Sequence, residues 1–149
     1  MIHDQYQKSV YMLNVASVAT TATATGWVDT LGYEYCSIDA LLDSAAAVSS
    51  NPAVLKLSES KVTNVTSDTD LAVFTGDDTT DGFTIPDADT DSAQIVRFNV
   101  DLRTRERYLF IHITPAGAAQ IVGAVARLSR AKEMTAGTSS PSVAAVVTG

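Results

Sequence analysis

The chain has 149 residues, a single cysteine and a net charge of −7, and 46% of its residues are hydrophobic. This length fits one domain with its own core, and a lone cysteine excludes an internal disulfide framework or a multi-cysteine metal site. The acidity argues against a dedicated nucleic-acid-binding protein, because neutralising phosphates supplies most of that affinity, and no apolar run is long enough for a membrane-spanning helix.

Residues 1–25 are expected to contain an N-terminal arm and a first strand. Met1–Lys8 is polar, with Tyr6 as its only aromatic residue, and it lacks the basic start, apolar stretch and cleavage site of a secretory signal. We therefore expect synthesis in a cytoplasm.

Residues 26–132 are predicted to form one β-sandwich domain. Two runs alternate apolar and polar residues with a period of two, as half-buried strands do, and others are rich in β-branched residues. Turn-forming residues separate these runs, and seven or eight short strands at this spacing predict an all-β fold, an antiparallel β-sandwich or jelly roll. The predicted strands are Glu34–Leu42, Val54–Glu59, Leu71–Thr75, Gln94–Leu102, Arg107–Thr114 and Gln120–Leu128.

The alternation also selects the inward-facing residues of these strands. Helix signals are weak. The Ala-rich run Ala116–Ala126 contains three β-branched residues and two glycines, and this composition favours a strand. The predicted core consists of Cys36, Ile38, Leu57, Phe98, Val100, Leu109 and Ile111.

Charge is unevenly distributed along the chain. Between Val62 and Val96 there are eight aspartates and no lysine or arginine, whereas the segment from Arg97 onward is rich in arginine. Such a division predicts complementary surfaces, for example between copies of the chain.

The aspartate-rich segment has one pattern related to calcium binding. Asp87-x-Asp89-x-Asp91 is similar to the start of a calcium loop, but Ser92 and Phe98 stand where an EF-hand needs glycine and glutamate. An EF-hand is therefore excluded. An irregular calcium site remains an alternative to a solvated acidic loop.

Residues 133–149 are predicted to form a C-terminal arm, because this Thr-, Ser-, Ala- and Gly-rich segment is too poor in large apolar groups to pack by itself. One alternative is disorder. The other is that the arm becomes ordered on a neighbouring subunit, with Val143–Val147 as a short strand added to a neighbour's sheet edge.

Patterns that carry catalysis are missing from the sequence. His3 lies in the N-terminal arm, and His112 alternates with Phe110 in a predicted strand, which is typical of a structural histidine. Nucleophile elbows, phosphate-binding loops and zinc-protease patterns do not occur. We therefore expect no enzymatic activity, no cofactor and no metal. A β-sandwich hydrolase with an unrecognised site and a carbohydrate-binding or adhesion module remain alternatives, although only Trp27 and a few tyrosines could serve as sugar-stacking platforms.

Four segments, taken in order, resemble one family. They are Gly26–Tyr33 (GWVDTLGY), Val54–Ser60 (VLKLSES), Asp101–Leu109 (DLRTRERYL) and Gly123–Arg130 (GAVARLSR). Their order resembles the capsid decoration (cement) proteins of tailed bacteriophages, in which a Leu-x-Glu-Ser strand and an Arg-rich turn before Tyr-Leu recur in a β-sandwich. The likeness spans residues 26–132, and the aspartate-rich insertion between Val65 and Ala93 departs from it.

The resemblance implies a structural virion protein on the capsid exterior, bound to the major capsid protein and associated as a homotrimer, with no nucleic-acid or membrane partner. A tail-tube or head-completion role is the alternative within phage structural proteins. Copies repeated over a shell would gain affinity through avidity.

Five residues are predicted at these interfaces. Aromatic residues anchor many protein interfaces, and an arginine fork pairs bidentately with carboxylates. We expect the arginine-rich run to be a hairpin tip that docks on acidic groups of the capsid or on Asp77–Asp91 of another copy, with a merely solvated turn as the alternative. The predicted interface residues are Trp27, Tyr33, Arg103, Arg105 and Arg107.

Overall fold

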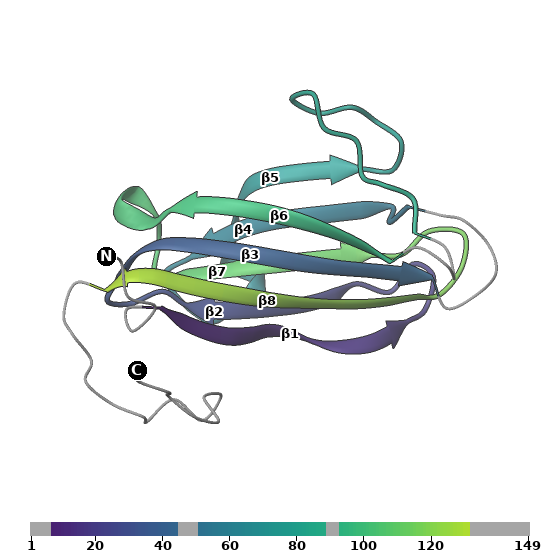
Figure 1. Cartoon of the computed structure of the whole chain (residues 1–149). Helices are drawn as coiled ribbons and strands as arrows, with labels where there is room; N and C mark the ends of the chain where they lie inside the picture. The colour runs from purple at the N-terminus through teal and green to yellow at the C-terminus, as the bar shows by residue number, and fades with distance from the viewer. Residues whose placement is uncertain (1–6, 45–50, 89–92, 132–149) are drawn as a thin grey trace, which may run out of the picture.

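The computed structural model describes residues 7–44, 51–88 and 93–131. In this part of the chain, eight strands form two antiparallel four-stranded sheets that pack face to face (Figure 1). The all-β sandwich predicted from the sequence is therefore confirmed. The strands are β1 (Lys8–Val18), β2 (Ala24–Asp29), β3 (Tyr33–Ser44), β4 (Val54–Ser60), β5 (Thr69–Thr75), β6 (Gln94–Asp101), β7 (Tyr108–Thr114) and β8 (Gln120–Ala131).

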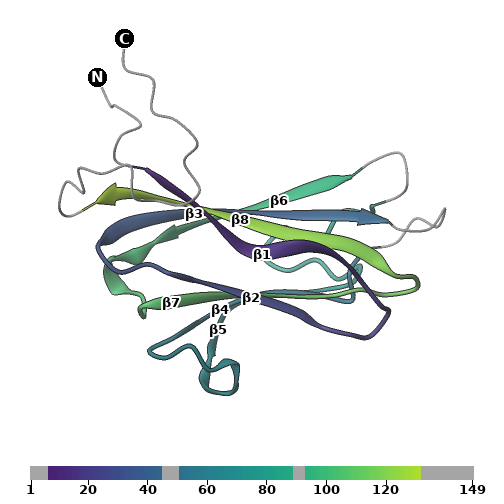
Figure 2. The ribbon, with the colours of Figure 1, turned by 90° about the horizontal axis from the view of Figure 1, so that it is seen from below.

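The strand order is that of a jelly roll. Sheet A has the order β1-β8-β3-β6 and sheet B the order β2-β7-β4-β5. Of the connections between consecutive strands, only that between β4 and β5 stays within one sheet, and the others cross between the two layers that Figure 2 shows edge-on. This eight-stranded, double Greek-key arrangement leaves four edge strands, β1 and β6 in sheet A and β2 and β5 in sheet B.

The core lies between the two sheets and follows the predicted alternation. In β6, for example, Val96, Phe98 and Val100 are buried, while Arg97 and Asn99 point outward. Burying such a side chain contributes about 1.5–3 kcal/mol. All seven residues of the predicted core belong to the buried cluster, which confirms the register assigned from the sequence.

The N-terminal region contributes more to the sandwich than an arm would. β1 begins at Lys8, pairs with β8 along one edge of sheet A, and buries Met12 in the core. It falls within residues 1–25, which the sequence analysis placed before the sandwich domain. Residues 1–6 and 132–149, and hence most of both predicted arms, lie outside the described residues.

The predicted hairpin between β6 and β7 is wrong. β6 belongs to sheet A and β7 to sheet B, so residues 102–107 cross from one sheet to the other. β6 ends at Asp101, whose carboxylate accepts a hydrogen bond from the backbone N–H of Arg103 at 3.1 Å and so caps a 3-10 turn, η3 (Leu102–Thr104). The alternation in the sequence continues to Leu102. The side chain of Leu102 is buried, as the alternation predicts, but the residue belongs to the η3 turn and not to β6.

Candidate interaction surface

The five predicted interface residues all lie at one end of the sandwich. Here β2, β4 and β6 finish and β3 and β7 begin, next to the η3 turn (Figure 1). Trp27 is near the end of β2, Tyr33 opens β3, Arg103 and Arg105 belong to η3 and its C-cap, and Arg107 directly precedes β7. We call this region the arginine end.

Arg107 holds the centre of the arginine end together. Its guanidinium binds the carboxylate of Asp29 through two hydrogen bonds, Nε to Oδ1 at 3.0 Å and Nη2 to Oδ2 at 2.6 Å. The same guanidinium lies 5.0 Å from the ring centre of Tyr108, and that ring meets Trp27 edge-on at 5.6 Å. The hydrogen bond from Arg107 holds the pKa of Asp29 below its usual value. Four side chains, two from β2 and those of Arg107 and Tyr108 at the start of β7, thus form one connected unit.

The other two arginines also have carboxylate partners in their own chain. Arg105 lies 3.4 Å from Oε1 of Glu59, whose Oε2 accepts the backbone N–H of Glu106 at 2.8 Å. Arg103 pairs with Asp101, two positions before it in sequence. An exposed ion pair of this kind contributes little to stability, so a carboxylate of another protein could replace Asp101 at little cost. Glu59, in contrast, is only 12% exposed and holds Arg105 more firmly.

Tyr33 is placed differently from the other four residues. Its side chain is partly buried and packs against the hydrophobic core, and its backbone lies opposite Ala131 of β8. The ring thus stabilises the start of β3.

Exposed apolar side chains accompany the charges at this end. Trp27 is 45% exposed, and Leu31, in the turn from β2 to β3, is 67% exposed. This turn is anchored by the backbone N–H of Thr30, which donates to the carbonyl of Arg107 at 2.9 Å. Exposed aromatic and aliphatic groups surrounded by polar pairs are typical of protein-binding surfaces.

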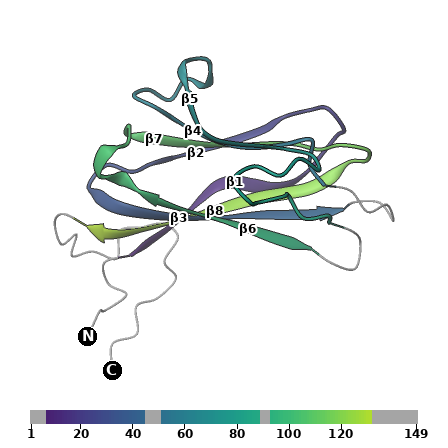
Figure 3. The same ribbon diagram turned by 90° about the horizontal axis from the view of Figure 1, so that it is seen from above.

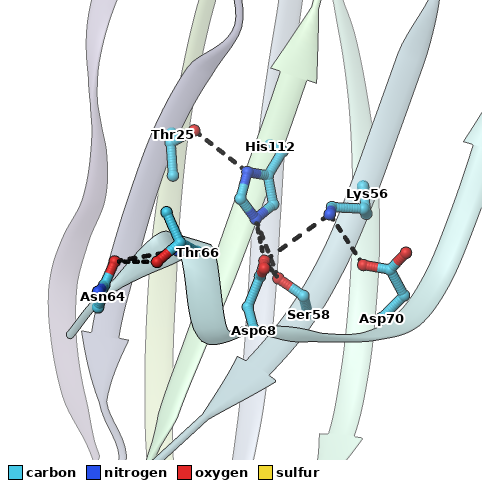
Figure 4. A network of polar contacts seen from close by, with 8 residues as sticks. All are labelled: Thr25, Lys56, Ser58, Asn64, Thr66, Asp68, Asp70 and His112. Carbon is cyan, nitrogen blue, oxygen red and sulfur yellow. Dashed lines mark hydrogen bonds and ion pairs between the residues drawn. The ribbon is translucent and has the colours of Figure 1, made fainter. Parts of the chain in front are cut away.

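A second polar cluster lies on the outer face of sheet B (Figure 4). Its centre, His112, Ser58 and Asp68, is almost closed to solvent, whereas the side chain of Asp70 is 52% exposed. Nε2 of His112, on β7, contacts Oδ2 of Asp68 at 2.8 Å and Oγ of Ser58 at 3.0 Å, while its Nδ1 contacts Oγ1 of Thr25 at 3.1 Å. Lys56 binds Asp70 at 2.8 Å and approaches Asp68 at 3.7 Å. Asp68 follows η2 (Val65–Ser67), the short 3-10 turn between β4 and β5.

This cluster contains the residue types of a serine hydrolase but not the required arrangement. In a catalytic triad the histidine uses one nitrogen for the serine and the other for the carboxylate. Here Ser58 and Asp68 share Nε2, Ser58 also donates to Asp68, and the Ser58 side chain is fully buried. These contacts hold the histidine in place and do not activate Ser58.

The charge states in the cluster follow from burial and hydrogen bonding. Burial, followed by the positive charge of Lys56, lowers the pKa of His112 in spite of the neighbouring Asp68. Burial acts to raise the pKa of Asp68, but the hydrogen bonds from Ser58 and His112 outweigh it and the pKa lies below its usual value. The cluster is therefore stable with a neutral histidine and an ionised aspartate.

Some aspartates of the aspartate-rich segment accept hydrogen bonds from other residues of the same chain. Asp77 accepts a hydrogen bond from Asn51 at 2.6 Å, and Asp78 accepts one from Thr75 at 3.1 Å. Within residues 7–44, 51–88 and 93–131, no group of three or more His, Cys, Asp or Glu side chains is arranged to hold a metal ion. Asp89 and Asp91 of the calcium-like pattern lie outside the described residues.

The sequence did not reveal the carboxylate partners at the arginine end or the partners of His112. Asp29 and Arg107 are separated by 78 positions and Glu59 and Arg105 by 46, so no local spacing announces either pair. The available signal was indirect, because Asp29 and Glu59 each lie within a segment that carries the family resemblance. Ser58 and Asp68 match no catalytic or binding pattern.

No protein-family model matches the chain, and no curated protein has a significantly similar sequence. Among the described residues, no helix is long and apolar enough to cross a membrane.

Proposed function

We propose that this chain is a structural protein of a tailed-phage virion that binds the outside of the head and stabilises contacts between capsomers, as decoration proteins do. The observation that carries the proposal is the convergence at the arginine end of the four segments that resemble this family. Asp29 of the first segment binds Arg107 of the third, and Glu59 of the second binds the backbone of Glu106 of the third. The fourth segment reaches the same end of the sandwich, where Ser129 lies opposite Tyr35 at the start of β3.

The specific contacts between the first three segments support a shared role for them at this end of the sandwich. They also suggest a way of binding. Trp27 and Leu31 supply apolar contact area, and Arg103, whose pair with Asp101 is exposed, exchanges that carboxylate for acidic groups of the major capsid protein. A trimer that contacts several capsomers would add the affinity of each contact.

The test is cosedimentation of the purified chain with undecorated heads of the phage that encodes it. We expect saturable binding, and we expect Trp27→Ala to weaken it at least tenfold because a central aromatic anchor contributes about 2 kcal/mol or more. Ile95→Ala is the matched control, since Ile95 is 61% exposed but lies on β6 of sheet A. If wild-type protein fails to bind heads, or if both variants bind as it does, the proposal is wrong.

A second candidate, a carbohydrate-binding module, is favoured by the exposure of Trp27 beside Tyr108. The two rings stand at 85° to each other, so only one of them can stack flat on a sugar. Specific glycan binding that disappears in Trp27→Ala, without binding to heads, would replace the first proposal with this one.

Sedimentation of the free protein tests the expected trimer. A stable monomer, both alone and with heads, would exclude it.

A further inference from the structure

The sandwich is closed along one side and open along the other. At the closed side, β1 approaches β2 so tightly that a Cβ atom on Gly26 would lie 2.0 Å from the carbonyl oxygen of Met12. At the other side are β5 and β6, and among the described strands none pairs with the outer edge of either one.

The described residues of the connection that follows β5 cover part of this open side (Figure 3). Ile85 and Ala88 of the connection are buried in the core, and the ring of Phe83 packs on Phe74 at 4.9 Å. Those contacts cover the part of the side near the end of β5. No described residue of this connection lines the part next to η3.

A groove occupies this uncovered part. Its apolar wall consists of Leu57, Leu71, Ala72, Phe98 and Val100, and the polar side chains of Asn99, Asp101, Thr104 and Arg105 line it toward η3. Among the described strands, the groove is therefore bordered by two edges that pair with no further strand, and its lining combines apolar and polar side chains. An extended apolar segment satisfies both features, because its backbone completes the ladder while alternate side chains fill the groove.

We propose that Val143–Val147 of the same chain occupies this groove as an additional strand, antiparallel to β6. The segment reads Val-Ala-Ala-Val-Val, carries no charge, and lies outside the described residues. Its small and β-branched side chains suit the apolar wall of this groove, and β-branched residues favour extended backbone.

The position of the end of β8 makes the connection within one chain feasible. β8 ends at Ala131 at the arginine end, and in sheet A only β3 separates it from β6. A strand on the outer edge of β6 lies three strand spacings from β8, which amounts to about 14 Å, whereas the eleven residues 132–142 reach about 36 Å when extended. A segment entering beside η3 then runs against the direction of β6, which gives antiparallel pairing.

The same connection favours the chain's own segment over that of a second copy. A short tether gives an effective concentration in the millimolar range, which exceeds that of free copies in dilute solution. Docking would also cover the edges of β5 and β6, which would otherwise be open to edge-to-edge association. This inference does not depend on the proposed function.

Disulfide trapping in the full-length chain tests the proposal. Leu71→Cys is combined with Ala145→Cys, and the control combines Ala145→Cys with Val15→Cys on β1, at the opposite side of the sandwich. Cys36 does not interfere, because it is buried and its pKa is raised to about 12. Thr104→Cys, at an exposed position lining the groove, replaces Leu71→Cys if that variant does not fold.

We expect the groove pair to form a cross-linked monomer at least tenfold faster than the control pair. Moving the second cysteine through positions 143–147 should give cross-linking rates that alternate with a period of two, as in a strand. Cross-linked dimers in place of monomers would overturn the proposal in favour of a second copy as the occupant. Equal rates for the groove pair and the control pair would overturn it as well.

Discussion

Replacing Gly26 by alanine tests whether the close contact between β1 and β2 is essential for the sandwich. The added Cβ would lie 2.0 Å from the Met12 carbonyl oxygen, 2.7 Å from its carbonyl carbon and 2.9 Å from Cα of Leu13. All three are backbone atoms, so no side-chain rotation relieves the clash. Reaching an ordinary contact of roughly 3.5 Å requires β1 to move by about 1.5 Å.

That movement would withdraw Met12, which is 5% exposed, from the core and strain the pairing of β1 with β8. Loss of a buried methionine contact costs about 2–5 kcal/mol, so we expect Gly26→Ala to lower the free energy of unfolding by about 3 kcal/mol. The total free energy of unfolding of a single domain is about 5–15 kcal/mol. Urea denaturation followed by tryptophan fluorescence measures the change.

Gly123→Ala is the matched control. Its Cβ would lie 2.7 Å from Cγ2 of Val15, which is 59% exposed and can turn away into solvent, and 3.3 Å from Cα of Val15, which needs a shift of only a few tenths of an ångström. We expect a loss of less than about 1 kcal/mol, and the double variant Gly123→Ala with Val15→Ala should recover most of it. If Gly26→Ala unfolds at the same urea concentration as the wild type, the reasoning about the β1–β2 contact is refuted.

Three further predictions concern the core and its polar groups. Phe98→Ala should destabilise the fold by about 3–5 kcal/mol in urea denaturation, and a loss below about 1 kcal/mol would contradict its burial. Because the folded-state pKa of His112 lies below its ordinary value, protonation favours the unfolded chain. The free energy of unfolding should therefore fall as pH drops from about 7 to 5, and this dependence should shrink in His112→Gln but persist in His3→Gln. The buried Cys36 thiol, with its pKa raised to about 12, should react with a thiol reagent at pH 8 only as fast as the protein opens, and prompt labelling of the folded protein would disprove its burial.

The local alternation of residues was sufficient to predict the all-β class and the core. In a strand, successive side chains point to opposite faces, so Val96, Phe98 and Val100 identify themselves as inward without knowledge of any other strand. β1 was harder to recognise, because its pairing with β8 is irregular around Met12 and Leu13 and most of its later residues are exposed.

The residue chemistry selected interface residues that the fold places at one end of the molecule, among them Trp27, Arg105 and Arg107. That these residues bind a partner stays a prediction. Tyr33 lies at the same end but packs against the core, because a tyrosine at the start of a strand can pack inward as readily as outward, and the sequence does not distinguish the two.

Only the tertiary structure decided which strands are neighbours and which charges are paired. Strand pairing depends on contacts between residues far apart in sequence, so the alternation in Gln94–Asp101 and Tyr108–Thr114 could not reveal that these strands belong to different sheets. For the same reason the link between Asp29 and Arg107 and the placing of Ser58, Asp68 and His112 around one nitrogen became visible only in the folded chain. Local periodicity fixes which face of a strand is buried, whereas the packing of the two sheets decides what each exposed side chain meets.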